Sequence, residues 1–135
     1  GLAFSKPALM TDLNRIMGGS GVALETLREA LFAQPVSTDR LMHFMRHMQP
    51  ESHRALWDMT LFDLPRISRM HRPPMLILGA DFDHLIPASA VEMTGRAYGI
   101  EPEFFAGMGH GLMLEADWRK VAQRIDEWLQ GLAIA

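Results

Sequence analysis

An aspartate and a histidine stand in two loops whose positions suit acid–base chemistry. Asp83 lies in "GADFDHLIP" (79–87), and His110 lies among three glycines in "GMGHGLMLE" (107–115). Each loop follows a short apolar segment typical of a strand, and open α/β sheets place their active sites at the carboxyl ends of strands. If the two strands are neighbours, the carboxylate accepts a hydrogen bond from one imidazole nitrogen and the other nitrogen acts as a base. An unperturbed histidine, with a pKa of about 6.5, suits this task near neutral pH.

A second carboxylate, that of Asp81, lies in the same loop and is the alternative acid. Loop carboxylates often cap backbone amides instead, and we favour that interpretation for Asp81. Asp81 is therefore the second choice for the acid.

The elements that must position these loops are predicted from residue 73 onward. The run "MLILGA" (75–80) is typical of a strand buried on both faces, and "EPEFFA" (101–106) is a second strand candidate. Residues 87–98 between them are predicted to form a helix that starts near a proline. Asp117 is the expected N-cap of a last helix, whose apolar stripe comprises Trp118, Val121, Ala122, Ile125, Trp128, Leu129 and Leu132. The order predicts two parallel strands joined by a right-handed crossover, an α/β arrangement.

Residues 1–72 are predicted instead to form short helices separated by breakers. Ser5, Ser20, either Ser37 or Thr38, and Pro50 mark the four expected helix starts. The third of these helices is expected to place Leu41, Met42, Met45 and Met48 on one face. Seven of the 11 methionines precede residue 73, which suits either core packing or a mobile lid over an apolar substrate.

The predicted sheet is incomplete as it stands. Two parallel strands are too few for an independent sheet, and parallel sheets are normally covered on both faces. We therefore expect something outside these strands to complete it.

The overall composition excludes several classes of function. A formal charge of −3 gives no reason to expect nucleic acid or an anionic membrane as a partner, and no apolar run approaches the length of a membrane span. The absence of cysteine excludes thiol catalysis and disulfides. No signal-peptide pattern is present, but the chain begins with Gly1 rather than Met, so the cytoplasm is only the default expectation.

The last 75 or so residues resemble the C-terminal part of an α/β-hydrolase-fold protein. The shared features are a strand ending at Gly79, then Asp83 followed by Ile86-Pro87, a helix and strand, the loop Gly107-x-Gly109-His110, and a closing amphipathic helix. The resemblance implies that residues 1–72 are a helical lid or cap and that residues 73–135 are the C-terminal β-α-β-α segment of the hydrolase core.

The same resemblance implies that Asp83 is the acid and His110 the base of a catalytic triad. Asp83 is preferred to Asp81 because Pro87 follows it at the family's usual offset. With a serine nucleophile the class is esterase, lipase or a related acyl hydrolase, acting on a small apolar ester-like substrate. With an aspartate nucleophile, relatives cleave epoxides or carbon–halogen bonds. Cofactor-free haloperoxidases and carbon–carbon bond hydrolases also remain open.

The nucleophile of such a triad is not recognisable in this chain. The family places it in a G-x-S-x-G elbow between a strand and a helix. The nearest stretch, "MGGSGVAL" (17–24), has Val22 in place of the second glycine, follows no buried strand and falls in the lid-like region. Ser20 is therefore interpreted as a helix cap. The chain alone also lacks the oxyanion donors, and we expect it to be inactive in isolation.

No cofactor is expected, and metal binding is the less favoured reading of the histidines. His43 and His47 have the i, i+4 spacing of a metal pair, but only His53 suggests itself as a third ligand. His84 could join Asp83 and His110 around a metal, although the resemblance explains that pair without one. His84 is then a loop side chain near the site entrance.

Two partners are expected for the incomplete sheet: a missing N-terminal hydrolase portion or a second copy of the chain. The alternative function is a non-catalytic helical module that associates with itself through the free strand edge.

Overall fold

The computed structural model describes residues 24–49, 52, 54, 55, 58, 66 and 71–134. Several predictions concern other residues and lie outside this description: the helix after Ser5, Ser20 and its elbow-like stretch, most of the helix after Pro50, and His53. Within the described ranges, every helix is too short or too polar to span a membrane.

The described fold is a mixed α/β arrangement built on two parallel strands, as predicted. Strand β1 (Leu78–Ala80) pairs with β2 (Glu103–Phe105), with Leu78 opposite Glu103. Both strands are shorter than the predicted segments 75–80 and 101–106.

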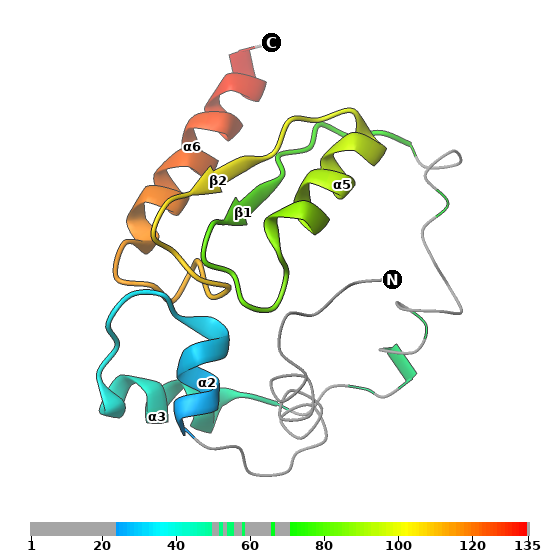
Figure 1. The fold of residues 1–135 in the computed structure, drawn as a ribbon. Helices are drawn as coiled ribbons and strands as arrows, with labels where there is room; N and C mark the ends of the chain where they lie inside the picture. The colour runs from blue at the N-terminus through cyan, green and yellow to red at the C-terminus, as the bar shows by residue number, and fades with distance from the viewer. Residues whose placement is uncertain are drawn as a thin grey trace.

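Two helices cover opposite faces of this small sheet (Figure 1). Helix α5 (Ala88–Tyr98) contains Val91, which lies on the side that a side chain at Gly79 would occupy. Helix α6 (Trp118–Ile134) packs Val121 against Ala80 on the other face. Residues 79 and 80 serve different faces because successive strand residues point to opposite sides. Both helices begin where the sequence predicted, and Pro87 occupies the N-cap position of α5.

Helices α2 (Leu24–Leu31) and α3 (Thr38–His47) pack on each other beside the carboxyl ends of the strands (Figure 1). The Ser37 hydroxyl accepts a hydrogen bond from the Arg40 amide at 3.3 Å, which confirms the predicted cap. Their shared core contains Leu27, Phe32 and Leu41.

The predicted apolar face of α3 is wrong in part. Leu41 is fully buried and Met45 packs against the cluster, but Met42 and Met48 are exposed. Phe44 takes the remaining inward position and stacks on Phe32, with ring centroids 5.8 Å apart. The inward positions are thus i, i+3 and i+4 from Leu41, the geometry of one helical face.

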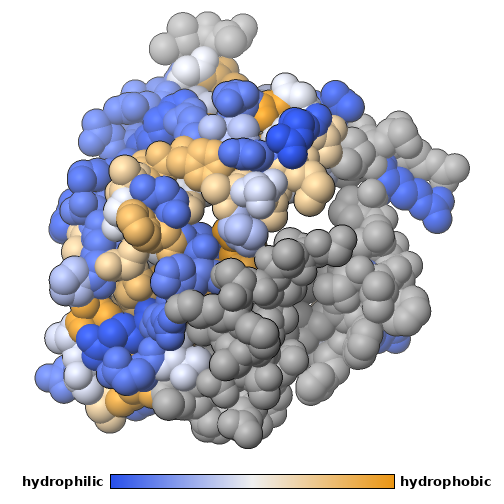
Figure 2. All heavy atoms as spheres, viewed as in Figure 1, coloured by the Kyte–Doolittle hydropathy of each residue, from blue (hydrophilic) through white to orange (hydrophobic). Residues whose placement is uncertain are grey.

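The apolar stripe of α6 is only partly covered. Val121 is buried, whereas Ile125, Leu129 and Leu132 are exposed. A helix of 17 residues is about 25 Å long, while a three-residue strand spans about 10 Å, so the sheet cannot cover the whole helix. Figure 2 shows a band of hydrophobic residues over the region of the strands, beside the largely hydrophilic surface of α6 turned to the viewer.

A polar contact also joins α6 to β2. The Arg124 guanidinium donates two hydrogen bonds to the Glu103 carboxylate, of 2.6 and 2.5 Å.

Candidate active site

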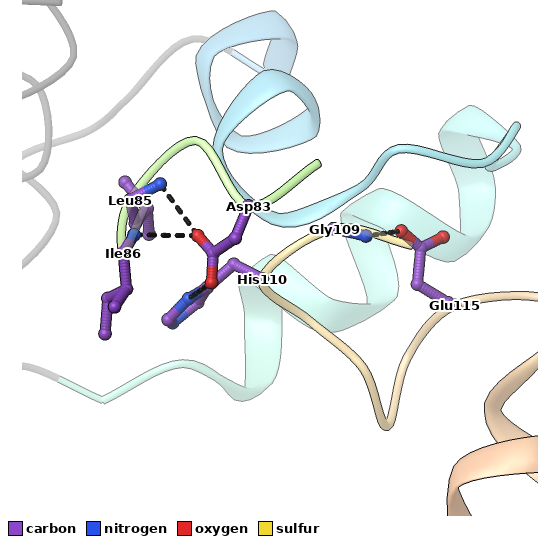
Figure 3. Close-up of polar contacts among 6 residues, drawn as sticks. All are labelled: Asp83, Leu85, Ile86, Gly109, His110 and Glu115. Atoms are coloured by element: carbon purple, nitrogen blue, oxygen red, sulfur yellow. Dashed lines mark hydrogen bonds and ion pairs between the residues drawn. The ribbon is translucent and has the colours of Figure 1, made fainter. Parts of the chain in front are cut away.

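Asp83 and His110 face each other across the carboxyl ends of β1 and β2 (Figure 3). The distance from His110 Nδ1 to Asp83 Oδ2 is 2.9 Å. The Asp83 side chain is 10% exposed and that of His110 is 35% exposed. The structure therefore brings together the two residues that the sequence singled out, with the carboxylate sheltered and the imidazole open to solvent on part of its surface.

The two oxygens of Asp83 have separate partners. Oδ1 accepts hydrogen bonds from the Leu85 and Ile86 amides, both at 2.8 Å, while Oδ2 faces His110. Burial alone would raise the pKa of Asp83, but the hydrogen bonds from His110, Ile86 and Leu85 outweigh it and the pKa lies below its ordinary value. Asp83 is therefore an ionised carboxylate near neutral pH.

This arrangement fixes which nitrogen of His110 carries the proton. An ionised carboxylate can only accept hydrogen bonds, so Nδ1 must be the donor in the Asp83–His110 contact. In the neutral imidazole, Nε2 then holds the lone pair. The Asp83 carboxylate thus favours the tautomer in which Nε2 is free to accept a proton.

Asp81 caps a backbone amide, which is the role that the sequence favoured for it. Its Oδ1 accepts a hydrogen bond from the Gly107 amide at 2.8 Å. Gly107 has a φ of 69°, a conformation that glycine adopts without the steric cost of a side chain. The Phe82 amide also donates to the Met108 carbonyl at 3.1 Å. These two hydrogen bonds join the acid loop to the histidine loop.

The histidine loop is anchored in the core on one side. Met108 is fully buried and packs with Ala80 and Val121 between the sheet and α6. Because Met108 is fixed between β1 and α6, the chain emerges toward His110 at a defined place.

On its other side the loop is held by Glu115, which sequence reasoning missed. Glu115 is 1% exposed, and its Oε1 accepts a hydrogen bond from the Gly109 amide at 2.8 Å (Figure 3). The sequence analysis assigned Glu115 no role. The only available signal was its position shortly after the Gly-rich loop, and its main partners, Ala33 and Gln34, lie more than 80 positions away.

The glycines of the histidine loop permit close contact with the end of α2. A Cβ on Gly109 would lie 2.7 Å from the Ala33 amide nitrogen. The Gly111 amide donates to the Leu31 carbonyl at 2.7 Å. At Gly109 a glycine is required by the close approach of another backbone segment.

No group of three metal-ligating side chains occurs within the described ranges. His43 and His47 lie on one face of α3 with ring centroids 4.3 Å apart, and His47 Nδ1 lies 2.7 Å from the His43 carbonyl oxygen. That contact occupies one nitrogen of His47 with backbone. His84 is exposed, and its loop lines a hollow of about 420 Å³.

This hollow lies between α2 and the acid loop and is walled by Arg28, Phe32, Phe82 and His84, with two glutamates at its rim. Phe82 and His84 flank Asp83 in the chain. The hollow therefore opens next to the acid loop and combines aromatic walls with charged groups.

Serines within the described ranges have other roles. Ser37 caps α3, the Ser52 hydroxyl accepts from the Ala55 amide at 3.3 Å, and Ser89 lies in the first turn of α5. Among these residues no serine is hydrogen-bonded to His110. The described residues thus supply a carboxylate–imidazole pair without a serine beside it.

Comparison with protein-family models, with curated proteins and with solved structures finds no match for this chain.

Proposed function

We propose that Asp83 and His110 are the acid and base of a catalytic triad of the α/β-hydrolase type. The chain would be a part of that hydrolase, with residues 1–72 as lid and 73–135 as the end of the core. The observation that carries the proposal is the 2.9 Å contact between His110 Nδ1 and Asp83 Oδ2 at adjacent parallel strand ends. An exposed imidazole backed by a sheltered carboxylate is the arrangement that general-base catalysis requires.

The reaction we propose is acyl transfer to water. His110 Nε2 takes the proton from a nucleophilic hydroxyl as its oxygen attacks the ester carbonyl. The tetrahedral intermediate collapses, and the imidazolium gives that proton to the departing alcohol. Water, deprotonated by the same nitrogen, then hydrolyses the acyl intermediate, and His110 returns the proton to the nucleophile oxygen. Asp83 stays ionised throughout, and no cofactor is needed.

The nucleophile and the oxyanion donors belong to a part outside this chain in the proposal. Acid and base without these groups leave covalent catalysis negligible. We therefore expect the 135 residues to bind a completing partner, and to hydrolyse esters only with it. An aspartate nucleophile in that partner would direct the same pair toward epoxides or carbon–halogen bonds.

A small substrate with an apolar group is the class we propose. The hollow beside the acid loop is of the size typical of small-molecule sites and has Phe32 and Phe82 in its walls. An ester of a short acid fits this volume and chemistry.

Native mass spectrometry of the protein isolated from its own cells, followed by denatured intact mass, tests the proposal first. We expect a second, heavier chain that contains a strand–elbow–helix nucleophile. The complex should hydrolyse p-nitrophenyl butyrate, and His110→Ala should abolish this activity, while His43→Ala on α3, outside the lining of the hollow, retains it. Hydrolysis that survives His110→Ala, or a sample made only of inactive 135-residue chains, would refute the hydrolase function.

A second candidate is the non-catalytic module that associates with itself. The exposed side chains of Ile125, Leu129 and Leu132 on α6 favour it, because a two-stranded sheet leaves them uncovered. Homo-oligomers without ester hydrolysis in the same experiment would support this function.

A further inference from the structure

Glu115 is a fully buried carboxylate within the site region that the acid–base pair does not use. It is the one charged residue of the described chain that is buried. No Lys or Arg side chain of the described residues forms an ion pair with it. A buried charge without a counterion needs strong hydrogen-bond donors, because burial removes its hydration.

Backbone amides supply those donors. Oε1 accepts from the Ala33 amide at 2.6 Å and from the Gly109 amide at 2.8 Å. The Gln34 amide lies 3.2 Å from Oε2 and 3.4 Å from Oε1. Successive amides that point at one anion form a concave site that compensates negative charge. The carboxylate therefore joins two backbone segments that would otherwise have unpaired amides facing each other.

One of the two segments carries the histidine, and the other joins two helices. Gly109 directly precedes His110, and residues 33–34 connect α2 to α3. Around Glu115, the Gly111 amide donates to the Leu31 carbonyl, and the Arg40 guanidinium donates to the Leu114 carbonyl at 3.2 Å. Glu115 and the Gly111 contact thus restrain the backbone on both sides of His110.

We propose that Glu115 is a positioning residue, which holds His110 against Asp83 by fixing the Gly109 amide to the Ala33–Gln34 segment. Its catalytic meaning rests on the proposed function, but the positioning itself does not. A Gln at 115 can still present one oxygen to the Ala33 and Gly109 amides and should keep most of the geometry, while its NH2 group would replace the nearer acceptor of the Gln34 amide. An Ala would leave three donors without a partner, and an Asp would be too short by one methylene.

The Asp83–His110 hydrogen bond gives a direct readout. In proton NMR of the purified chain, we expect the His110 Nδ1 proton as a downfield resonance that is absent in His110→Ala. Glu115→Ala should broaden or remove this resonance and speed exchange of the Gly109 amide by about tenfold or more. Glu115→Gln should restore the resonance, and Glu127→Gln, on the exposed face of α6, should leave it unchanged.

Folding is monitored in the same samples through the amide resonances of β1 and β2. A folded Glu115→Ala that keeps the His110 resonance and a slow Gly109 amide would overturn the proposal. If Glu115→Ala does not fold, Glu115→Gln decides, because its single oxygen should leave the Gln34 amide in faster exchange than in the parent. An unchanged Gln34 amide there would refute the role.

The outcome is independent of ester hydrolysis. Loss of the His110 resonance without any hydrolase activity in the complex would support the positioning role and refute the proposed function. Hydrolysis by the complex that is unaffected by Glu115→Ala would support the proposed function and refute the positioning role.

Discussion

Asp83 divides its two oxygens between the turn that carries it and the base that it supports. Oδ1 holds the Leu85 and Ile86 amides, and Oδ2 holds His110. The local structure of the loop and the tautomer of the imidazole therefore depend on the same side chain through different atoms. Substitutions that remove one function at a time can separate them.

Asp83→Asn is expected to preserve the turn and change the tautomer. The Asn oxygen can still accept both amides, but its NH2 group faces His110 Nδ1, which must then become the acceptor. The proton moves to Nε2, and the base is lost. Imidazole nitrogen shifts in NMR should report this change, and ester hydrolysis by the completed complex should fall by about 10⁴-fold. Unchanged nitrogen shifts would contradict the assigned geometry.

Asp83→Ala should instead destabilise the protein, because two amides and the imidazole lose their acceptor. We expect a loss of about 1–3 kcal/mol in the free energy of unfolding, larger than that for Asp83→Asn. Urea unfolding of the two variants measures this difference. Equal stability of the two would show that the amide contacts contribute little.

The lowered pKa of Asp83 predicts a pH dependence with a definite sign. A carboxylate whose pKa is lower in the folded state contributes its full stabilisation above its unfolded pKa of about 3.9. That contribution is lost as the pH falls from there through the folded pKa. The stability difference between the parent chain and Asp83→Asn should therefore shrink as the pH falls below about 4. Urea unfolding at a series of pH values in this acidic range measures it, and a difference that grows on acidification there would be inconsistent with the shift.

For single residues, the sequence predicted the Asp83–His110 pair but not the contacts of Glu115 with the histidine loop. Asp83 and His110 follow the two strand segments, so strand adjacency was enough to place them together. Asp81 was also interpreted correctly as an amide cap. Glu115 had no comparable local signal, because its partners at Ala33 and Gln34 come from a distant part of the chain.

At the scale of elements, the contact between the histidine loop and the end of α2 depends on Gly109. Because a Cβ there would meet the Ala33 backbone at 2.7 Å, Gly109→Ala should push the two segments apart. We expect lower stability and a weaker His110 Nδ1 resonance. Gly131 in α6 is the matched control, since a Cβ added there would meet nothing within 4 Å. Gly131→Ala should stabilise the chain by up to about 1 kcal/mol through helix propensity. Thermal unfolding of both variants tests the opposite signs.

Element boundaries followed local signals where those signals were strong. Ser37, Pro87 and the residues after Asp117 marked helix starts correctly. The inward face of α3 was misjudged because it is selected by Phe32 of a neighbouring segment, which the periodicity of α3 alone does not contain. The strands were overestimated because pairing length depends on the partner strand as well as on the strand's own residues.

At the scale of the whole molecule, the last helix, α6, is longer than the sheet on which it packs. Two short strands leave the C-terminal half of the apolar stripe on α6 uncovered. The two strand segments alone predicted a sheet with too few strands, and the described residues contain a sheet of two strands. Both proposed functions depend on a partner that would complete this sheet, and the described elements do not identify it.

A charge placed on the stripe tests whether α6 contacts the completing partner or second copy. Leu129 is 51% exposed, so Leu129→Lys should leave the fold intact. If the stripe is part of the interface, burying the new ammonium is costly and association should weaken at least about tenfold. Gln130→Lys adds the same charge one position away, on the polar face beside Asp126, and should associate like the parent. Light scattering and native mass spectrometry over a concentration series measure both variants. Equal association of the two would exclude this part of α6 from the interface.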